Sequence, residues 1–600
     1  MKYSDQFMDW LVDLGYTHCF FVGGGNVMHL LESARTRMVC IPTAHEVAAG
    51  IAAEYFNESQ TDSSKRAFAM VTAGPGLTNI VTAVGGAWLE SRELLLIGGQ
   101  AKTADLSRGF VRQIGHQEID GVGIMRPITK ASVLVESPMP FSELERLTEL
   151  TRSGRSGPVF IEMCIDITAR EVKEVPGSPN NLLSQHEAPS SDEIDLVIDM
   201  IKNAKRPMFL FGGGLTRECV NSSIDLMNKV GIPAAMTWNG ADRLPLSHRL
   251  NFGRPNTYGM RRGNLLIQQS DLVIALGTRL GLQQTGFAWE KFVPIGKLVQ
   301  VDIDANELSK PSPAVDLPIC ADANTVFIEI LKTLDEQDMV GRWNEWLDFG
   351  NEVSAMIPLK DSANEVKPEF IEAFDFVAEL SNVLDEGDTV IPCSSGGAYT
   401  TMMAGFENKK NQIIITDKGL ASMGYGLSGA IGASLARPES RTILVEGDGG
   451  FAQNFQEIGT AVAQNLNLKM FIFSNDGYAS IRTMQRAYFN GNYAGCDAAT
   501  GVVLPDWLAL FAAYGVPAEV LNPIDPFGKE SVKKLMNSTT PAAFIVPIDP
   551  EQTYWPRITS RITDSGSMES NPIHLMTPAL NDQIARKALK YIYEAGLPVQ

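Results

Sequence analysis

The chain has 600 residues, of which 44% are hydrophobic and 20% are charged, and its formal net charge is −20. That length is too great for one hydrophobic core and predicts about three or four domains of a soluble globular protein. The strong negative charge argues against nucleic acid or an anionic membrane surface as a partner.

The first predicted domain spans residues 1–172. Four apolar runs in it have the length of buried strands, at 18–24, 67–74, 93–99 and 157–163. Helix-length segments separate these runs, and buried strands that alternate with helices are typical of a doubly wound parallel sheet. Residues 174–193, rich in Pro, Ser and Asn, predict a linker after this domain.

Two further domains and a tail follow. The central domain is predicted at 190–345, with strands at 207–214, 271–280 and 297–304. The third is predicted at 368–555, with strands at 389–395, 412–417, 442–448, 469–475 and 542–548. The tail, 556–600, contains no clear strand and ends in an amphipathic helix pattern. The predicted fold class is therefore α/β, with three doubly wound parallel-sheet domains and a C-terminal tail.

The most informative motif is Gly447-Asp448-Gly449, which is followed by Asn475 after one strand–helix–strand unit. Such a unit brings both strand ends to the same edge of the sheet, where open α/β sheets place ligands. One carboxylate, one amide oxygen and a backbone carbonyl suit Mg²⁺, a hard ion that keeps phosphate oxygens in its shell. The glycines would let a diphosphate approach the backbone closely. A tight turn without a ligand is the alternative, and Asn475 at the matching strand end argues against it.

This segment resembles the diphosphate-binding motif of the thiamine-diphosphate enzymes, in which GDG is followed one helix later by NN. The chain departs from that motif at one position, where Ser474 replaces the first Asn. The second Asn is the metal ligand in the family. The resemblance therefore implies thiamine diphosphate and Mg²⁺ as cofactors, with Asp448, Asn475 and the carbonyl of Gly477 holding the ion against the diphosphate.

Glu46 lies in a segment, 43–56, that is rich in alanine and other small residues, as expected of a buried helix at a tight interface. A glutamate among such residues is costly unless it has a partner, although the helix dipole also favours a lone Glu in a first turn. The order of elements resembles the pyrimidine-binding domain of the same enzymes, where a Glu bonds the aminopyrimidine ring. The resemblance implies that Glu46 is the carboxylate that activates the cofactor.

Further motifs, at 21–34, 72–79 and 418–434, extend the resemblance over nearly the whole chain. They point to the acetohydroxyacid synthase, pyruvate oxidase and pyruvate decarboxylase branch, and most closely to acetolactate synthase-like proteins of polysaccharide pathways. In that branch an apolar residue wedges between the cofactor rings. Met423 matches it, with plain core packing as the alternative, and the carbonyl of Ala421 would bond the 4′-amino group. The implied cofactor-binding set also includes Thr72, Gly74, Asn79, Ser394, Ser395, Gly396, Gly447, Gly449, Gly450, Gly477 and Tyr478.

The predicted substrate pocket lies in loops beside the cofactor. Gln117 matches a Gln that reaches towards the reacting centre in the synthase branch. His116 stands where that branch has an apolar residue, and it is predicted either to act in acid–base catalysis or to cap the loop backbone. His29 is a further catalytic candidate. Arg482 and Arg486, on the helix after the metal loop, are predicted either to bind a substrate carboxylate or phosphate or to form a solvated helix face.

The resemblance also bears on further cofactors and on assembly. The related central domain binds FAD in synthases and oxidases but not in pure decarboxylases, and the Gly-rich stretches 212–218 and 277–281 leave FAD open here. In the family, the cofactor bridges the pyrimidine-binding domain of one subunit and the diphosphate-binding domain of another. A homodimer, or a tetramer built as a dimer of dimers, is therefore implied, with sites at the interface.

The predicted activity is that of a C–C bond lyase or transferase. It would decarboxylate a 2-oxo acid, pyruvate first, and ligate the two-carbon unit to a carbonyl acceptor, either a 2-oxo acid or a keto-sugar. A simple decarboxylase, a lyase and an FAD-linked oxidase stay open within the family. A catalytically silent structural or regulatory homologue is an alternative of another class, against which Glu46, Asp448 and Asn475 argue. A nicotinamide dehydrogenase is a rival, but no clean GxGxxG motif follows a predicted strand.

The seven cysteines are scattered and form no CxxC pair, which argues against a zinc site or a disulfide framework. Such a set is typical of reduced thiols in a cytoplasmic protein. The N-terminus lacks the basic start and apolar core of a signal peptide. No apolar run approaches the length of a membrane span.

Overall fold

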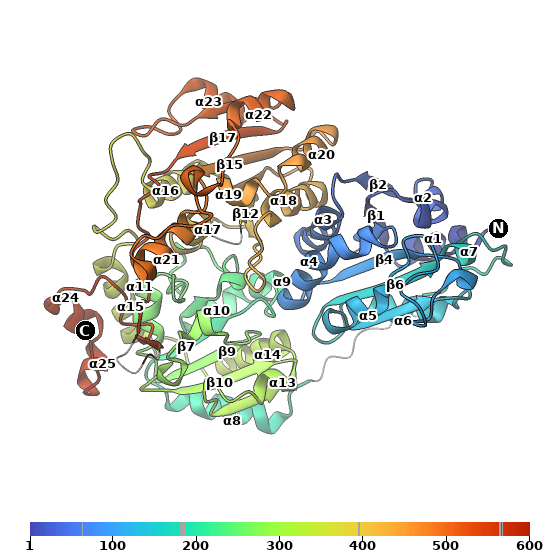
Figure 1. Ribbon diagram of the computed structural model, residues 1–600. Coiled ribbons are helices and arrows are strands. Elements are labelled where there is room, and N and C mark those ends of the chain that lie inside the picture. The colour runs from blue at the N-terminus through green and yellow to red at the C-terminus, as the bar shows by residue number, and fades with distance from the viewer. Residues whose placement is uncertain (63, 180–187, 394–395, 563–565, 567, 600) are drawn as a thin grey trace.

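The computed structural model describes residues 1–600 except 63, 180–187, 394–395, 563–565, 567 and 600. The described part contains three parallel sheets flanked by helices, and one short antiparallel pair of strands (Figure 1). The predicted α/β class with three parallel sheets is confirmed, whereas the domain boundaries stay predictions. None of the described helices is long and apolar enough to cross a membrane.

The first sheet has the strand order β2-β1-β3-β4-β6-β5. Its strands are β1 (Tyr16–Phe21), β2 (Val39–Pro42), β3 (Arg66–Val71), β4 (Leu94–Gln100), β5 (Ala131–Val135) and β6 (Pro158–Cys164). Its helices are α1 (Tyr3–Asp13), α2 (Met28–Ala34), α3 (Glu46–Ser59), α4 (Pro75–Glu90), α5 (Gly121–Met125), α6 (Phe141–Leu150) and α7 (Ile165–Thr168). One face packs α1, α2 and α6, and the other packs α3 and α4 in a core shared with the third domain.

The central sheet has the order β11-β10-β9-β7-β8. Its strands are β7 (Pro207–Phe211), β8 (Ala234–Met236), β9 (Leu272–Leu276), β10 (Lys297–Asp302) and β11 (Leu317–Cys320). Its helices are α8 (Ser191–Asn203), α9 (Arg217–Ser222), α10 (Ile224–Val230), α11 (Arg261–Ile267), α12 (Leu282–Thr285), α13 (Ala305–Leu308), α14 (Ala323–Glu336) and α15 (Asn344–Met356).

The third sheet has the order β13-β12-β14-β15-β17-β16, which repeats the first when each sheet is numbered from its own first strand. Its strands are β12 (Thr389–Pro392), β13 (Ile413–Ile414), β14 (Thr442–Gly447), β15 (Leu468–Ser474), β16 (Ala518–Val520) and β17 (Ala542–Pro547). Its helices are α16 (Ala373–Val383), α17 (Gly396–Gly405), α18 (Tyr425–Ala436), α19 (Asp448–Phe451), α20 (Ile458–Ala463), α21 (Ala479–Phe489), α22 (Trp507–Ala513) and α23 (Glu530–Met536).

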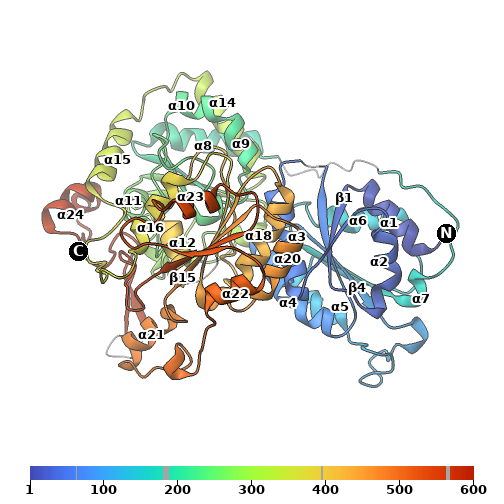
Figure 2. The same ribbon diagram turned by 90° about the horizontal axis from the view of Figure 1, so that it is seen from above.

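The first and third domains meet along α3 and α18 (Figure 2). A Cβ on Gly432 would lie 2.0 Å from the carbonyl oxygen of Ala52, so the two backbones touch and only glycine fits there. The Tyr425 hydroxyl donates to Glu54 at 2.8 Å, and the Arg92 guanidinium also donates to Glu54 at 2.8 Å. The small residues of 43–56 therefore do form a tight helical interface, as their pattern predicts.

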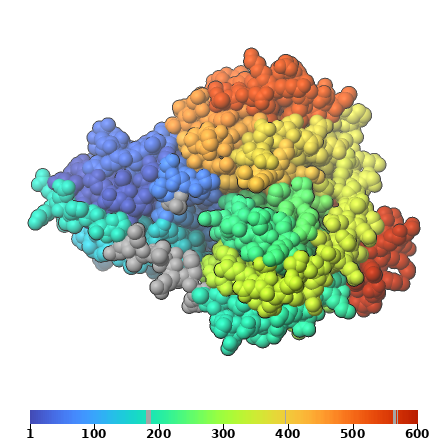
Figure 3. Space-filling model, turned by 180° about the vertical axis from the view of Figure 1, so that it is seen from behind, coloured from blue at the N-terminus to red at the C-terminus, as the bar shows by residue number. Residues whose placement is uncertain are grey.

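The tail differs from its prediction. It contains two short antiparallel strands, β18 (Ser560–Ile562) and β19 (Met568–Ser570), and its amphipathic segment forms two helices, α24 (Asp582–Ala588) and α25 (Lys590–Glu594). Strands of three residues are too short to show a readable alternation. The two helices bury apolar side chains in the core of the central domain, and Figure 3 shows the tail, in red, at its margin.

Candidate functional site

Asp448 occupies the edge of the third sheet where β14 ends and α19 begins. Its carboxylate accepts hydrogen bonds from three backbone amides, those of Gly449 (2.7 Å), Asn475 (2.9 Å) and Gly477 (3.4 Å). Burial raises the pKa of Asp448 to about 6, although these amide bonds lower it. The parallel pairing of β14 with β15 therefore brings Asp448 and Asn475 together, as the strand-end argument predicts.

The side-chain amide of Asn475 completes a compact polar cluster. One of its two polar atoms lies 3.2 Å from Asp448 Oδ1 and 3.2 Å from the carbonyl oxygen of Gly477. With the amide oxygen in that place, three oxygens face one another, which is the donor set of a hard cation; with the amide turned over, its NH₂ donates to both. The residues thus fit Mg²⁺. Among the described residues, no group of three or more His, Cys, Asp or Glu offers another metal site.

Two glycines of this edge are required by close packing, and a third borders open space. Gly477 has φ +115, and a Cβ there would lie 2.5 Å from the carbonyl oxygen of Cys496. A Cβ on Gly449 would collide with the Tyr478 ring, which packs over it. A Cβ on Gly447 would meet nothing within 4 Å, so the backbone at the end of β14 borders open space. The open space at Gly447 fits the approach of a diphosphate.

The loop between β13 and α18 carries Ala421 and Met423. Ala421 has a left-handed backbone with φ +54. Asp417 accepts from the amides of Leu420 (3.3 Å) and Ser422 (3.1 Å), and so fixes the loop from within. The Met423 side chain is 37% exposed, so it is not packed in the core.

Glu46 is buried at the first position of α3, on the carboxyl edge of the first sheet. Asn79 Nδ2 donates to Glu46 Oε2 at 3.0 Å, so two residues predicted for the cofactor site are in contact. Thr72 follows β3, and its Oγ1 accepts from the amide of Asn26 (3.4 Å), in the loop that leads to α2 and His29. His29 is half-buried there.

Gln117 belongs to the long loop after β4 and packs beside Gly74. It has φ +59, and a Cβ on Gly74 would lie 2.8 Å from the Gln117 carbonyl oxygen. Glu118 shapes this loop by accepting from the amides of Ile114 (2.8 Å) and Ser107 (2.5 Å). Burial alone would raise the pKa of Glu118, but these bonds lower it to about 2. His116 is exposed.

Three carboxylates that organise these loops escape sequence reasoning. Besides Asp417 and Glu118, the buried Glu457 accepts from the amides of Ala44 (3.1 Å) and His45 (2.9 Å), just before α3. A third-domain side chain thereby fixes the backbone next to Glu46. Carboxylates that accept backbone amides have no characteristic spacing, so no sequence signal could have found them.

Helix α4 separates the two parts of the predicted site within one chain. Near its start, Asn79 contacts Glu46; at its last residue, Glu90 accepts from the amide of Lys418 at 2.7 Å. A helix rises about 1.5 Å per residue, so about 16 Å of helix lies between these contacts. Glu46 and Lys418, which belongs to the loop that carries Met423, therefore contact opposite ends of α4.

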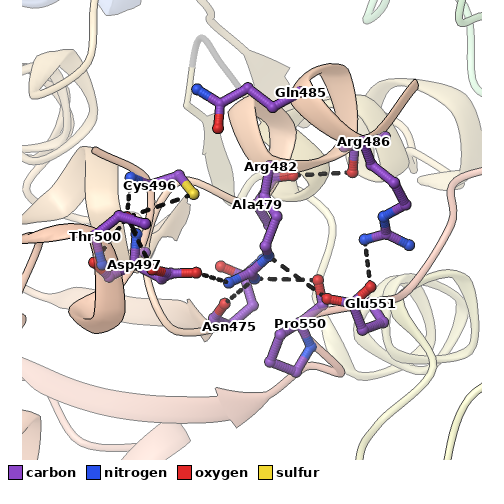
Figure 4. Close-up of polar contacts among 12 residues, drawn as sticks. Asn475, Ala479, Arg482, Gln485, Arg486, Cys496, Asp497, Thr500, Pro550 and Glu551 are labelled. Carbon is purple, nitrogen blue, oxygen red and sulfur yellow. Dashed lines mark hydrogen bonds and ion pairs between the residues drawn. The ribbon is translucent and has the colours of Figure 1, made fainter. Parts of the chain in front are cut away.

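Arg482 and Arg486 differ in their surroundings (Figure 4). The Arg482 side chain is buried, and its Nη2 donates to the carbonyl oxygens of Asn475 (3.0 Å) and Pro550 (3.1 Å). Arg486, one turn further along α21, is 41% exposed and pairs with Glu551. Of these two arginines, only Arg486 is exposed, as expected of a residue on a solvated helix face.

Of the other predicted cofactor residues, Ser394 and Ser395 lie outside the described part of the chain. Gly396 has φ +80 at the start of α17. A Cβ on Gly450 would approach Glu446 Oε1 at 3.0 Å.

Close packing explains Gly212, Gly214 and Gly277, which lie in the two Gly-rich stretches of the central domain. A Cβ on Gly212 would lie 2.1 Å from the Gly277 carbonyl oxygen, and one on Gly277 would lie 2.7 Å from Gly214. The ends of β7 and β9 thus press directly on each other. Arg243 Nη2 also donates to the carbonyl of Gly213 at 3.2 Å. These residues do not present a free glycine-rich turn and give FAD no support.

Comparison with known proteins agrees with this geometry. Residues 1–124 match the N-terminal TPP binding domain of the thiamine pyrophosphate enzymes, residues 194–332 their central domain, and residues 395–546 their C-terminal TPP binding domain. The chain belongs to the thiamine pyrophosphate enzymes. The two half-sites lie in the two matched TPP binding domains, which supports thiamine diphosphate as the cofactor.

Similar members of the family are acetolactate synthases. The acetolactate synthase isozyme 1 large subunit of Escherichia coli is 29% identical over 90% of this chain and 92% of that protein. A probable acetolactate synthase large subunit of Methanocaldococcus jannaschii is 29% identical over 92% of this chain and 93% of that protein. The thiamine pyrophosphate enzyme described here is therefore acetolactate synthase-like.

Proposed function

We propose that the enzyme decarboxylates a 2-oxo acid, pyruvate first, and ligates the two-carbon unit to a carbonyl acceptor, either a 2-oxo acid or a keto-sugar. The observation that carries this proposal is that both half-sites keep their reactive groups: a buried Glu46 held by Asn79, and the oxygen cluster of Asp448, Asn475 and Gly477. The similarity to acetolactate synthases over most of the chain supports the carboligase reading.

Each residue has a defined task in this proposal. Thiamine diphosphate, when bound, supplies the carbon nucleophile and the electron sink. Asp448, Asn475 and the Gly477 carbonyl would hold Mg²⁺ and through it the diphosphate. Glu46 keeps Oε2 on the Asn79 amide, which leaves Oε1 to exchange a proton with the pyrimidine. Met423, exposed beside the cofactor edge, would support the bent cofactor through apolar contact.

We also propose that a second copy of the chain completes each site. Glu46 and Lys418, which belongs to the loop that carries Met423, contact opposite ends of α4, and this separation favours a site whose two halves come from different chains. A homodimer, or a dimer of dimers, would join the first domain of one subunit to the third domain of its partner. Gln117, His116 and His29 would then approach the substrate from the first domain, and Arg486 from the third.

A substrate panel tests the activity. The protein would be incubated with thiamine diphosphate, Mg²⁺ and a series of 2-oxo acids, with and without carbonyl acceptors, while CO₂ and the ligated product are measured. We expect pyruvate to release CO₂, and an acceptor to raise the rate and to appear in the product. Equal CO₂ release without any ligated product would replace the carboligase by a simple decarboxylase, and a flavin spectrum with consumption of O₂ would replace it by an oxidase.

A further inference from the structure

Arg482 is a buried cation that binds the turn of the proposed metal site. It is 5% exposed, and Figure 4 shows its side chain extending from α21 between the Asn475 turn and Pro550. Its Nη2 is shared by the carbonyls of Asn475 and Pro550. A buried guanidinium must be hydrogen-bonded to offset its desolvation, so these contacts hold it in one geometry.

Two carboxylates flank Arg482 and form ion pairs with it. Asp497 Oδ2 lies 3.5 Å from Nη1, and Glu551 Oε1 lies 3.7 Å from Nε. Asp497 belongs to the segment that packs against the same turn, because the Tyr478 amide donates to the Cys496 carbonyl at 2.8 Å. Because Nη1 and Nε pair with these carboxylates, the remaining nitrogen, Nη2, donates to the backbone carbonyls of Asn475 and Pro550.

The peptide groups of Asn475 are consequently fixed on both sides. Its amide donates to Asp448 at 2.9 Å, and its carbonyl accepts from Arg482 at 3.0 Å. Because the backbone amide and carbonyl of Asn475 are both hydrogen-bonded, its side chain is oriented towards Asp448 Oδ1 and the Gly477 carbonyl. Groups that orient metal ligands in this way commonly change metal affinity by about 10–100-fold when they are removed.

We propose that Arg482 is a positioning residue for the cation site: by binding the backbone carbonyl of Asn475, it orients the side-chain amide of Asn475. This inference rests on the proposed Mg²⁺ and diphosphate site, and it gives Arg482 a role other than the substrate contact that its position on the helix suggests. Arg486 is the matched comparison, because it lies on the same helix, pairs with the same Glu551 and makes none of these turn contacts among the described residues.

Metal affinity tests this role. Mg²⁺ would be titrated calorimetrically into the metal-free protein at saturating thiamine diphosphate, for Arg482→Met, Arg482→Lys and Arg486→Met. We expect Arg482→Met to weaken Mg²⁺ binding by about 10–100-fold, Arg482→Lys to recover part of the loss because an ammonium can still donate to the carbonyls, and Arg486→Met to stay within about twofold.

The outcomes separate this inference from the proposed function. Mg²⁺ affinity of a folded Arg482→Met within twofold of the wild type would overturn the positioning role, and if that variant fails to fold, an unchanged Arg482→Lys affinity would do the same. A wild-type protein that binds Mg²⁺ with thiamine diphosphate but releases no CO₂ from any 2-oxo acid would refute the proposed reaction and leave the role of Arg482 intact.

A separate observation concerns Cys19 and Cys40, which are direct register partners on the parallel strands β1 and β2. Both face the core that contains α1 and α2, where Cys19 is buried and Cys40 is half-buried on the edge strand. Neighbouring strands lie about 4.8 Å apart, so the backbones of register partners are within the Cα separation that a disulfide spans. A hydrogen bond from Cys19 lowers the pKa of the Cys40 thiol, while burial raises that of Cys19.

We infer that Cys19 and Cys40 form a reversible disulfide under peroxide. The Cys40 thiolate attacks one peroxide oxygen, the O–O bond breaks, and Cys40 becomes a sulfenic acid with release of water. The Cys19 thiol then attacks the Cys40 sulfur, which forms the S–S bond and expels a second water. Peroxide is reduced by two electrons and the two thiols are oxidised by two.

Peptide mapping tests the pair, because trypsin cuts between the two cysteines at Arg35 and Arg37. The folded protein would be treated with hydrogen peroxide, alkylated and digested with and without dithiothreitol. We expect one reducible cross-linked peptide pair, which Cys40→Ser abolishes. Cys320→Ser is the control, since Cys320 is half-buried on the edge strand β11 but has Asp302 as its register partner. Peroxide-treated protein in which both thiols stay free, or in which Cys40 is oxidised only to sulfinic acid, would overturn the inference.

Discussion

Replacing Glu46 by glutamine is expected to lower 2-oxo acid turnover by about 10²–10⁴-fold while thiamine diphosphate binding changes little. Glutamine keeps the size of the side chain and can still accept from Asn79 through its amide oxygen. It cannot exchange a proton with the pyrimidine, so the loss falls on kcat. The measurement is steady-state CO₂ release at saturating cofactor, together with the cofactor Kd from fluorescence quenching.

The control for this substitution is Glu143→Gln, a surface glutamate on α6 that pairs with Arg146. It should leave both kcat and cofactor binding at wild-type values. A Glu46→Gln enzyme with nearly full turnover would remove Glu46 from the mechanism. A variant that lost cofactor binding as well would show that the carboxylate acts mainly as a binding group.

Asp448→Asn is expected to abolish activity in pure form, and to recover it when mixed with Glu46→Gln. Removing the only carboxylate of the cation cluster should weaken Mg²⁺-dependent cofactor binding on the order of 100-fold or more. If each site joins the first domain of one subunit to the third domain of another, a mixed dimer has one intact site and one doubly impaired site. Random exchange of subunits should therefore restore about one quarter of the wild-type activity.

The matched control mixes Glu46→Gln with a chain that carries both substitutions. In that mixture no subunit offers an intact first-domain half, so no recovery is expected. Both mixtures contain the same two substituted positions, but in the second mixture every chain carries Glu46→Gln. If the first mixture stayed as inactive as its components under conditions in which subunits exchange, the site would be built from one chain and the proposed arrangement would be wrong.

The sequence predicts the sheet architecture because buried parallel strands are continuous apolar runs. It also predicts the contact between Asp448 and the Asn475 turn, because neighbouring parallel strands end at one edge of the sheet. The contact between Glu46 and Asn79 is not predicted from the strand ends, because both residues are named only through the family resemblance.

Other features depend on the folded backbone and leave no pattern in the sequence. Glu118 and Glu457 act by accepting backbone amides, which places no requirement on neighbouring residue types. Arg482 has the sequence context of an exposed helix face, yet its side chain is buried because the chain around Pro550 and Asp497 closes over it. The strands of the tail are too short to be seen at all.

The repeated strand order of the first and third domains has a consequence for engineering substrate choice. The loop that carries Gln117 follows the fourth strand of its sheet, and the segment that carries Arg486 follows the fourth strand of the other. In the proposed dimer, these equivalent segments would come from different polypeptides and border the same site. To change the acceptor specificity, the Gln117 loop and the Arg486 segment would therefore have to be replaced together. If only one of them were replaced, it would lie beside a segment that fits a different acceptor.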